Sequence, residues 1–161
     1  VQITNWAGLP TGTSWTLCYR QSTDGPGAST FHSKCDNKGP TFVVARTSAG
    51  KTVGGYAGVS WTSASCSGNK SDPAAFLFSI SNSFRHGLIA AQANFAIWDC
   101  SSYGPTFGGG FDLRMQNGSG STNLGHTYEC RIGGYTTAEC QNDFAGAASF
   151  TYTEVEVFYA S

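Results

Sequence analysis

Apolar residues alternate with polar ones, or form short continuous runs, over most of the chain. Alternation has the two-residue period of a strand with one buried face, and a short continuous run is typical of a strand inside a sheet. These patterns occupy residues 15–20, 41–46, 52–56, 74–80, 95–98, 111–115 and 149–159. Glycine, serine, proline and aspartate separate them, as turn residues do. Seven or eight short strands spaced by turns predict an all-β fold, a sandwich of two antiparallel sheets.

One short segment has a helical period instead. Ala28, Phe31, His32 and Cys35 fall at i, i+3, i+4 and i+7, which places them on one face of a helix. Because His32 lies on this apolar face, we expect it to be a hydrogen-bonded core histidine. His86 follows an arginine in a polar stretch, so we expect it to be exposed.

The last strand alternates strictly. One face carries Thr151, Thr153, Val155, Val157 and Tyr159, and the other carries Phe150, Tyr152, Glu154, Glu156 and Phe158. The valines and the tyrosine make the first face apolar, so it can serve either as part of the core or as a subunit interface.

Length and composition exclude several classes of protein. The 161 residues suit a single domain, 1–161, with 40% hydrophobic, 14% aromatic and only 12% charged residues. The net charge is -1, which argues against nucleic acids as partners, since phosphate neutralisation needs a basic face. Acidic membranes are disfavoured for the same reason. Without a run of about 20 apolar residues, we expect no membrane insertion.

Six cysteines suggest an oxidising compartment. Their number is even and none forms a CxxC pair, so disulfides are favoured over a zinc site or a thioredoxin-type redox site. The six cysteines are Cys18, Cys35, Cys66, Cys100, Cys130 and Cys140. The chain also begins at Val1 rather than Met, as a mature secreted form does. We therefore expect a secreted, extracellular protein. Proximity suggests the pairs 18–35, 66–100 and 130–140, but six cysteines can pair in many other ways.

Six blocks in register resemble the TLDc domain family. They are TFHSKCDNKGPT (30–41), GGY (54–56), AFLFS (75–79), SYGPTFGGG with Asp112 (102–112), NLGHTYE (123–129) and EVEVF (154–158). The resemblance spans the chain from about residue 15 to its end. It implies a β-sandwich with one or two short helices. Intracellular members are associated with oxidation resistance and with binding the proton-pumping ATPase, and the family brings no settled catalytic constellation.

A weaker resemblance points to another class of function. In size, cysteine content and loop composition the chain is similar to the small secreted galactose-binding lectins of marine invertebrates such as sea anemones. That similarity implies calcium-dependent binding of galactose-terminated glycans.

The sequence lacks the spacings that catalytic sites need. The three histidines form no HExxH motif, and residues 58–62, GVSWT, lack the second glycine of a GxSxG nucleophile elbow. No GK[ST] follows the glycines at 54–55 or 108–110, so close backbone packing explains these glycines better than a phosphate loop does. We therefore expect no enzymatic activity.

Two polar clusters are candidate binding sites. Calcium prefers carboxylate and amide oxygens, and a sugar site adds an aromatic ring that stacks on the apolar face of the sugar. The candidate metal ligands are Glu139, Asp143, Asp112 and Asp99, and the candidate sugar-binding residues are Gln141, Asn142, Asp143, Trp61 and Tyr135. The alternatives are a capped polar loop for residues 139–143 and a dimer interface for the exposed aromatics.

The leading hypothesis is a secreted lectin that binds terminal galactose through calcium. The alternatives are a TLDc-type protein-interaction or oxidative-stress-protection domain without sugar binding, and a defence protein that acts on microbial surfaces. A single weak sugar site gains avidity by self-association, so we expect a homodimer, with the final strand as a candidate interface.

Overall fold

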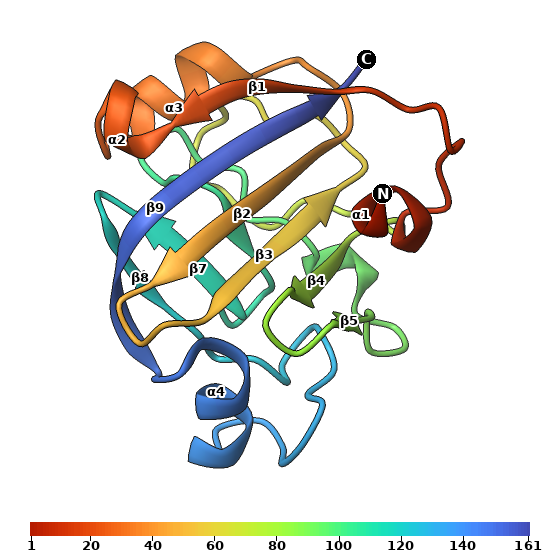
Figure 1. Ribbon diagram of the computed structural model, residues 1–161, viewed down its shortest axis with the longest axis vertical. Helices are drawn as coiled ribbons and strands as arrows, with labels where there is room; N and C mark the ends of the chain where they lie inside the picture. Colours follow the sequence, from red (N-terminus) through yellow and green to blue (C-terminus); the bar gives the residue numbers. More distant parts are fainter.

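Strand β9 (Ser149–Ala160) joins two antiparallel sheets in the computed structural model, which describes all 161 residues (Figure 1). The first sheet has the order β5 (Phe84–His86), β4 (Phe76–Ser79), β3 (Thr52–Ala57), β2 (Thr41–Thr47), β9 and β1 (Trp15–Arg20). The second has the order β9, β8 (Ser119–Ser121), β7 (Leu113–Gln116) and β6 (Thr106–Phe107). This architecture confirms the predicted all-β fold.

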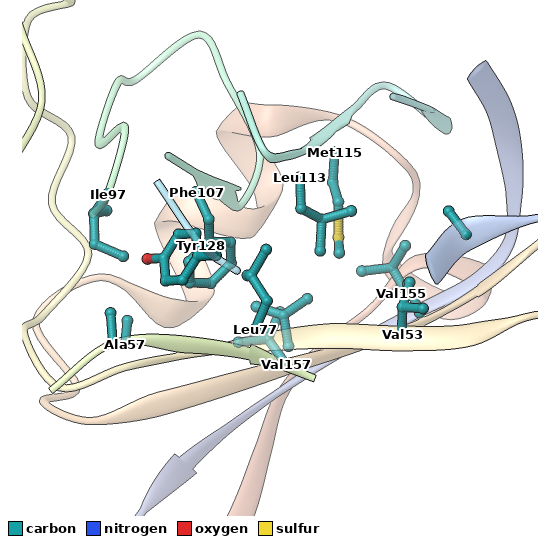
Figure 2. Packing of buried hydrophobic residues seen from close by; sticks show 14 of the residues in the cluster. Val53, Ala57, Leu77, Ile97, Phe107, Leu113, Met115, Tyr128, Val155 and Val157 are labelled. Carbon is teal, nitrogen blue, oxygen red and sulfur yellow. The ribbon is translucent and has the colours of Figure 1, made fainter. Parts of the chain in front are cut away.

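The main core lies between the two sheets. Leu113 and Met115 of β7 point toward Val53, Val155 and other aliphatic residues of the first sheet (Figure 2). A smaller apolar cluster lies on the outer face of the first sheet, where the one-turn helix α1 (Gln2–Trp6) covers the rings of β3 and β4. The first sheet therefore carries apolar side chains on both faces, which explains the continuous apolar run predicted at residues 74–80 around β4.

Strand β9 contains a bulge that the alternating pattern does not reveal. Arg46 pairs with Glu154 but Thr47 pairs with Tyr152, so one extra residue, Thr153, lies in β9. A bulge of this kind moves the following side chains to the opposite face. The predicted strict alternation is therefore wrong.

The bulge also decides the role of the final strand. Phe150 and Tyr152 are buried before it, and Val155 and Val157 are buried after it, all within the main core. The two valines are therefore not available as a subunit interface.

The helices are short and more numerous than the one or two expected. Helix α3 (Ala28–Cys35) confirms the helical prediction, and all four residues of the expected face are buried. Helix α4 (Ala138–Ala145) forms where we predicted a polar loop: Thr137 caps its start and Gly146, at a φ of 85°, ends it. The other helices are α1, α2 (Gln21–Asp24) and the 3-10 turn η1 (Ala93–Phe95), which replaces the strand predicted at 95–98.

Three disulfides connect these elements. Cys18–Cys35 links β1 to α3, Cys66–Cys100 ties together two loops, and Cys130–Cys140 closes a loop onto α4. These are the pairs that proximity suggested, and no cysteine is free. None of the helices has the length and apolar character needed to cross a membrane.

Candidate functional site

Asp112 is buried at the end of the glycine-rich loop. Its Oδ2 accepts hydrogen bonds from the backbone N–H groups of Gly125 (3.3 Å), Thr127 (2.9 Å) and Tyr128 (3.0 Å). Its Oδ1 has no hydrogen-bond partner, and burial raises the pKa of the carboxyl group against the opposing effect of these N–H donors. The side chain thus holds the 125–128 segment in place.

Asp99 is also buried, and its carboxylate has a full set of donors. It accepts hydrogen bonds from the backbone N–H of Thr62 (3.0 Å) and the hydroxyl of Thr62 (2.7 Å), and it pairs with Nζ of Lys70 at 3.1 Å. These contacts connect the loop after β3 to the segment before Cys100.

Helix α4 separates the members of the predicted 139–143 cluster. Gln141 points inward, where Oε1 accepts from the backbone N–H of Leu124 (2.9 Å) and Nε2 donates to its carbonyl oxygen (2.9 Å). Asp143 forms an ion pair with Arg131, while Glu139 and Asn142 are exposed. The cluster does not form a single polar surface, because successive helical residues point in different directions.

The acids predicted as calcium ligands belong to three separate hydrogen-bond groups, around Asp99, around Asp112 and on α4. The structure contains no group of three or more His, Cys, Asp or Glu side chains that could hold a metal ion. The calcium assignment stays a prediction.

Trp61 is a core residue rather than a sugar platform. It is only 1% exposed, and its Nε1 donates to the hydroxyl of Thr41 at 2.9 Å. The rings of Phe31 and Phe107 pack edge-on against it at centroid distances of 5.6 and 5.5 Å. The prediction that Trp61 stacks on a ligand is wrong because the polar loop around it folds over the core.

Two of the three histidines are buried. His32 confirms the expectation of a bonded core histidine: its Nδ1 lies 2.7 Å from Asp36 and its Nε2 2.9 Å from the carbonyl oxygen of Cys100. His86 is buried between Phe84 and Phe144, which contradicts the expected exposure. Its position on β5 faces the inside of the sheet, and the polar neighbours that suggested exposure face outward.

Tyr135 belongs to a row of accessible rings. It is 45% exposed, its ring centroid lies 5.5 Å from that of His126, and His126 lies 6.2 Å from Phe95, which is 43% exposed. We call Phe95, His126 and Tyr135 the aromatic surface. The three residues come from the turn η1, the 123–129 block and the loop closed by Cys130–Cys140.

Glycines allow these rings to lie against backbone. A Cβ at Gly109 would stand 2.9 Å from Cβ of Phe95 and 3.0 Å from Cε1 of His126, and a Cβ at Gly110 would stand 3.0 Å from Cγ of His126. Close packing, as expected for these glycines, therefore serves the aromatic surface. Sequence reasoning missed Phe95 and His126, and the adjacent glycines were the signal that large side chains pack on this loop.

Unfavourable backbone angles flank the aromatic surface. Thr136, next to Tyr135, has a φ of 66°, and Phe111, next to Gly110, has a φ of 58°. Positive φ is uncommon for β-branched and bulky residues and costs about 1–3 kcal/mol. The Cys130–Cys140 disulfide and the hydrogen bonds of Asp112 constrain the neighbouring backbone. Strain of this kind clusters at functional sites.

The aromatic surface is not part of a pocket. The molecule has two hollows, and neither is lined by Phe95, His126 or Tyr135. An exposed aromatic surface that lies outside any cleft is typical of a contact with a macromolecule, whereas small molecules bind in clefts.

Comparison with known proteins gives one result. The family model of the TLDc domain matches residues 4–161, almost the entire chain, and thus includes every residue of the aromatic surface. No curated protein matches the chain.

Proposed function

Because the chain belongs to the TLDc domain family, we propose that it is a protein-interaction module that works outside the cell without catalysis. The aromatic surface binds the partner. The observation that supports this most strongly is that Phe95 and Tyr135 are exposed and that each packs against His126, away from both hollows.

Rigid aromatic side chains favour such a role. Tyrosine is enriched among the residues that contribute most to protein interfaces, because its ring gives a large contact area with few rotatable bonds. The Cys130–Cys140 bridge constrains the loop that carries Tyr135, and Ile132 of the same loop adds a further exposed apolar side chain. Constraint in the free state lowers the entropy lost on binding.

An extracellular location is supported by the disulfides. Three bridges in a domain of this size are typical of oxidising compartments. Since no cysteine is free, the native chain offers no thiol for an oxidant to consume, and this favours an interaction role over direct protection against oxidation.

Sugar binding is a second candidate, and the exposure of Tyr135 favours it. In this alternative the ring stacks on galactose, with calcium supplying contacts to hydroxyl groups. It ranks second because Gln141 is turned into the core and Asp143 is paired with Arg131, which leaves Asn142 as the accessible amide of the cluster.

Cell binding after enzymatic treatment separates the two candidates. Fluorescently labelled protein is titrated onto a panel of animal and microbial cells that are untreated, treated with protease, or treated with β-galactosidase. Loss of binding after protease treatment, with binding retained after galactosidase and in chelator, supports a protein partner. Loss after galactosidase or in chelator supports the lectin alternative. Absence of binding to every cell type contradicts both.

A further inference from the structure

Five apolar residues line up across the outer face of the first sheet. The strand pairing places Leu17 (β1) opposite Phe158 (β9), Phe158 opposite Phe42 (β2), Phe42 opposite Tyr56 (β3), and Tyr56 opposite Phe76 (β4). Two neighbouring pairs of rings in this row stack, with centroid distances of 4.9 Å for Phe42–Phe158 and 5.1 Å for Tyr56–Phe76. We call these five residues the cross-strand row.

One end of the cross-strand row is covered and the other is open. Helix α1 lies over the end at β3 and β4, where Tyr56 and Phe76 are buried in a cluster with Ile3. Phe158 is half-buried, and Leu17 at the opposite end is 38% exposed. Exposure therefore increases toward the margin of the sheet, where Figure 1 shows β1 beside β9.

The margin itself is an unpaired strand edge. Strand β1 pairs with β9 only, and Asp24 accepts the backbone N–H of Arg20 at 2.8 Å near its end. A hollow of about 250 Å³ lies beside it, lined by Leu17, Cys18, Tyr19, Arg20, Thr23, Asp24 and Lys34. Because Thr23 and Asp24 belong to α2 and Lys34 to α3, the hollow separates the strand from these helices, which border the edge near Arg20. Unpaired edges are templates for the addition of another strand.

We propose that two copies of this chain associate through β1, paired antiparallel across a two-fold axis that places the two Leu17 side chains opposite each other. This arrangement continues the cross-strand row from one copy into the other. It covers the exposed end of the row with an apolar residue, which is the neighbour that Leu17 lacks in the single chain.

The side chains of β1 are complementary to themselves in this arrangement. Trp15 packs on Phe42 and Arg20 pairs with Glu156 at 2.9 Å, so both lie on the same outer face as Leu17. Antiparallel pairing keeps the two arginines at opposite ends of the joined strands. Each guanidinium instead lies toward the Trp15 of the other copy, where a cation–π contact is favourable.

This interface replaces the one expected at the final strand and is independent of the proposed partner-binding role. The bulge at Cys18 shortens the regular part of β1, so the paired region is small. Small interfaces are typical of weak, concentration-dependent association. We therefore expect a monomer–dimer equilibrium rather than a permanent dimer.

A cysteine placed at the two-fold axis tests the register. Directly opposed residues in an antiparallel pair have Cα atoms about 4.5–5.5 Å apart, within the range for a disulfide. Leu17→Cys should therefore form a covalent dimer under mild oxidation, at least tenfold faster than Ile80→Cys, which replaces an equally exposed residue beyond β4. Equal rates for the two variants overturn the proposal.

Sedimentation supplies the second measurement. The unmodified protein should approach twice its mass of 16.9 kDa as its concentration rises, and Leu17→Glu should remain monomeric with an unchanged circular-dichroism spectrum. A wild-type protein that is monomeric at every concentration overturns the proposal, and so does a Leu17→Glu variant that still dimerises. Strand addition by an added extended peptide to a strictly monomeric protein would assign the edge to another partner.

Discussion

Oδ2 of Asp112 accepts a hydrogen bond from the backbone N–H of Tyr128 at 3.0 Å, and so ties the second sheet to the segment that carries His126. The Tyr128 hydroxyl in turn donates to the carbonyl oxygen of Ala96 at 2.7 Å, next to Phe95. The buried carboxylate of Asp112 thus helps to position His126 directly and Phe95 through Tyr128.

Replacing Asp112 by Ala should destabilise the fold by about 3–5 kcal/mol, because three backbone N–H groups lose their acceptor and a buried unsatisfied donor costs about 1–3 kcal/mol. Asp112→Asn keeps an acceptor and should cost less. Urea unfolding at pH 7 measures both, with the exposed Glu129→Gln as the control. An Asp112→Ala variant as stable as the control would show that these hydrogen bonds do not hold the segment.

The same carboxyl group should give a dependence on pH. Burial raises its native pKa above the ordinary 3.8, so the native state retains the proton to higher pH than the unfolded chain does. Its contribution to stability therefore falls as pH rises from about 3.8 through the native pKa. Asp112→Asn should lack this fall, which the same unfolding experiment checks at pH 4 and pH 7.

His86 should make the protein sensitive to mild acid. Burial lowers the pKa of its imidazole below the ordinary 6.5, although the hydrogen bond with the carbonyl oxygen of Glu129 opposes the shift. Below pH 6.5 the imidazole is protonated in the unfolded chain but remains neutral in the native state. The free energy of unfolding therefore falls as pH falls, by at most about 1.4 kcal/mol per pH unit. His86→Gln should reduce the loss of thermal stability between pH 7 and 5. Parallel curves for the variant and the wild type would exclude His86 as the cause.

The three disulfides should contribute unequally to stability. Their sequence separations are 10 for Cys130–Cys140, 17 for Cys18–Cys35 and 34 for Cys66–Cys100. In the chain-entropy account these loops correspond to about 2.7, 3.1 and 3.8 kcal/mol. Variants with both cysteines of one bridge replaced by serine, compared by urea unfolding, should lose least stability for Cys130–Cys140 and most for Cys66–Cys100. The reverse order would show that native-state contacts dominate. A thiol assay on the native protein should find no free thiol.

Gly55 should resist substitution because the two sheets meet over it. A Cβ there would stand 2.7 Å from the ring of Phe107 and 2.8 Å from Leu77. Gly55→Ala should destabilise the protein by about 1–3 kcal/mol through overpacking. Gly12→Ala, with no atom within 4 Å of the new methyl group, should be nearly neutral. Similar unfolding midpoints for the two variants would mean that the core adapts at this position.

Much of the fold could be predicted from local patterns. Strands β2 to β4 and helix α3 follow the spacing of apolar residues, because each buries one regular face or lies inside the sheet. The bulge at Thr153 could not be predicted, since it depends on pairing with β2. Helix α4 was missed because its buried face includes the polar Gln141, although Thr137 and Gly146 are recognisable as its caps.

The candidate site could be predicted only in part. Tyr135 was identified as an exposed aromatic residue, but Phe95 and His126 come from segments that only the tertiary fold brings to it. The predicted acids failed to converge for the same reason. The sequence does not reveal which carboxylates accept hydrogen bonds from backbone N–H groups, as those of Asp112 and Asp99 do.

In the proposed function, this TLDc domain contacts its partner through the aromatic surface. The most direct measurement compares cell binding by the double variant Phe95→Ala/Tyr135→Ala with binding by Ile80→Ala, an exposed apolar residue beyond β4. Truncating two interface side chains should weaken binding at least tenfold, since each residue that dominates an interface contributes about 2 kcal/mol or more. Ile80→Ala should bind like the wild type, and both variants should keep the wild-type free energy of unfolding within about 1 kcal/mol. Unchanged affinity in a folded Phe95→Ala/Tyr135→Ala variant would contradict the account.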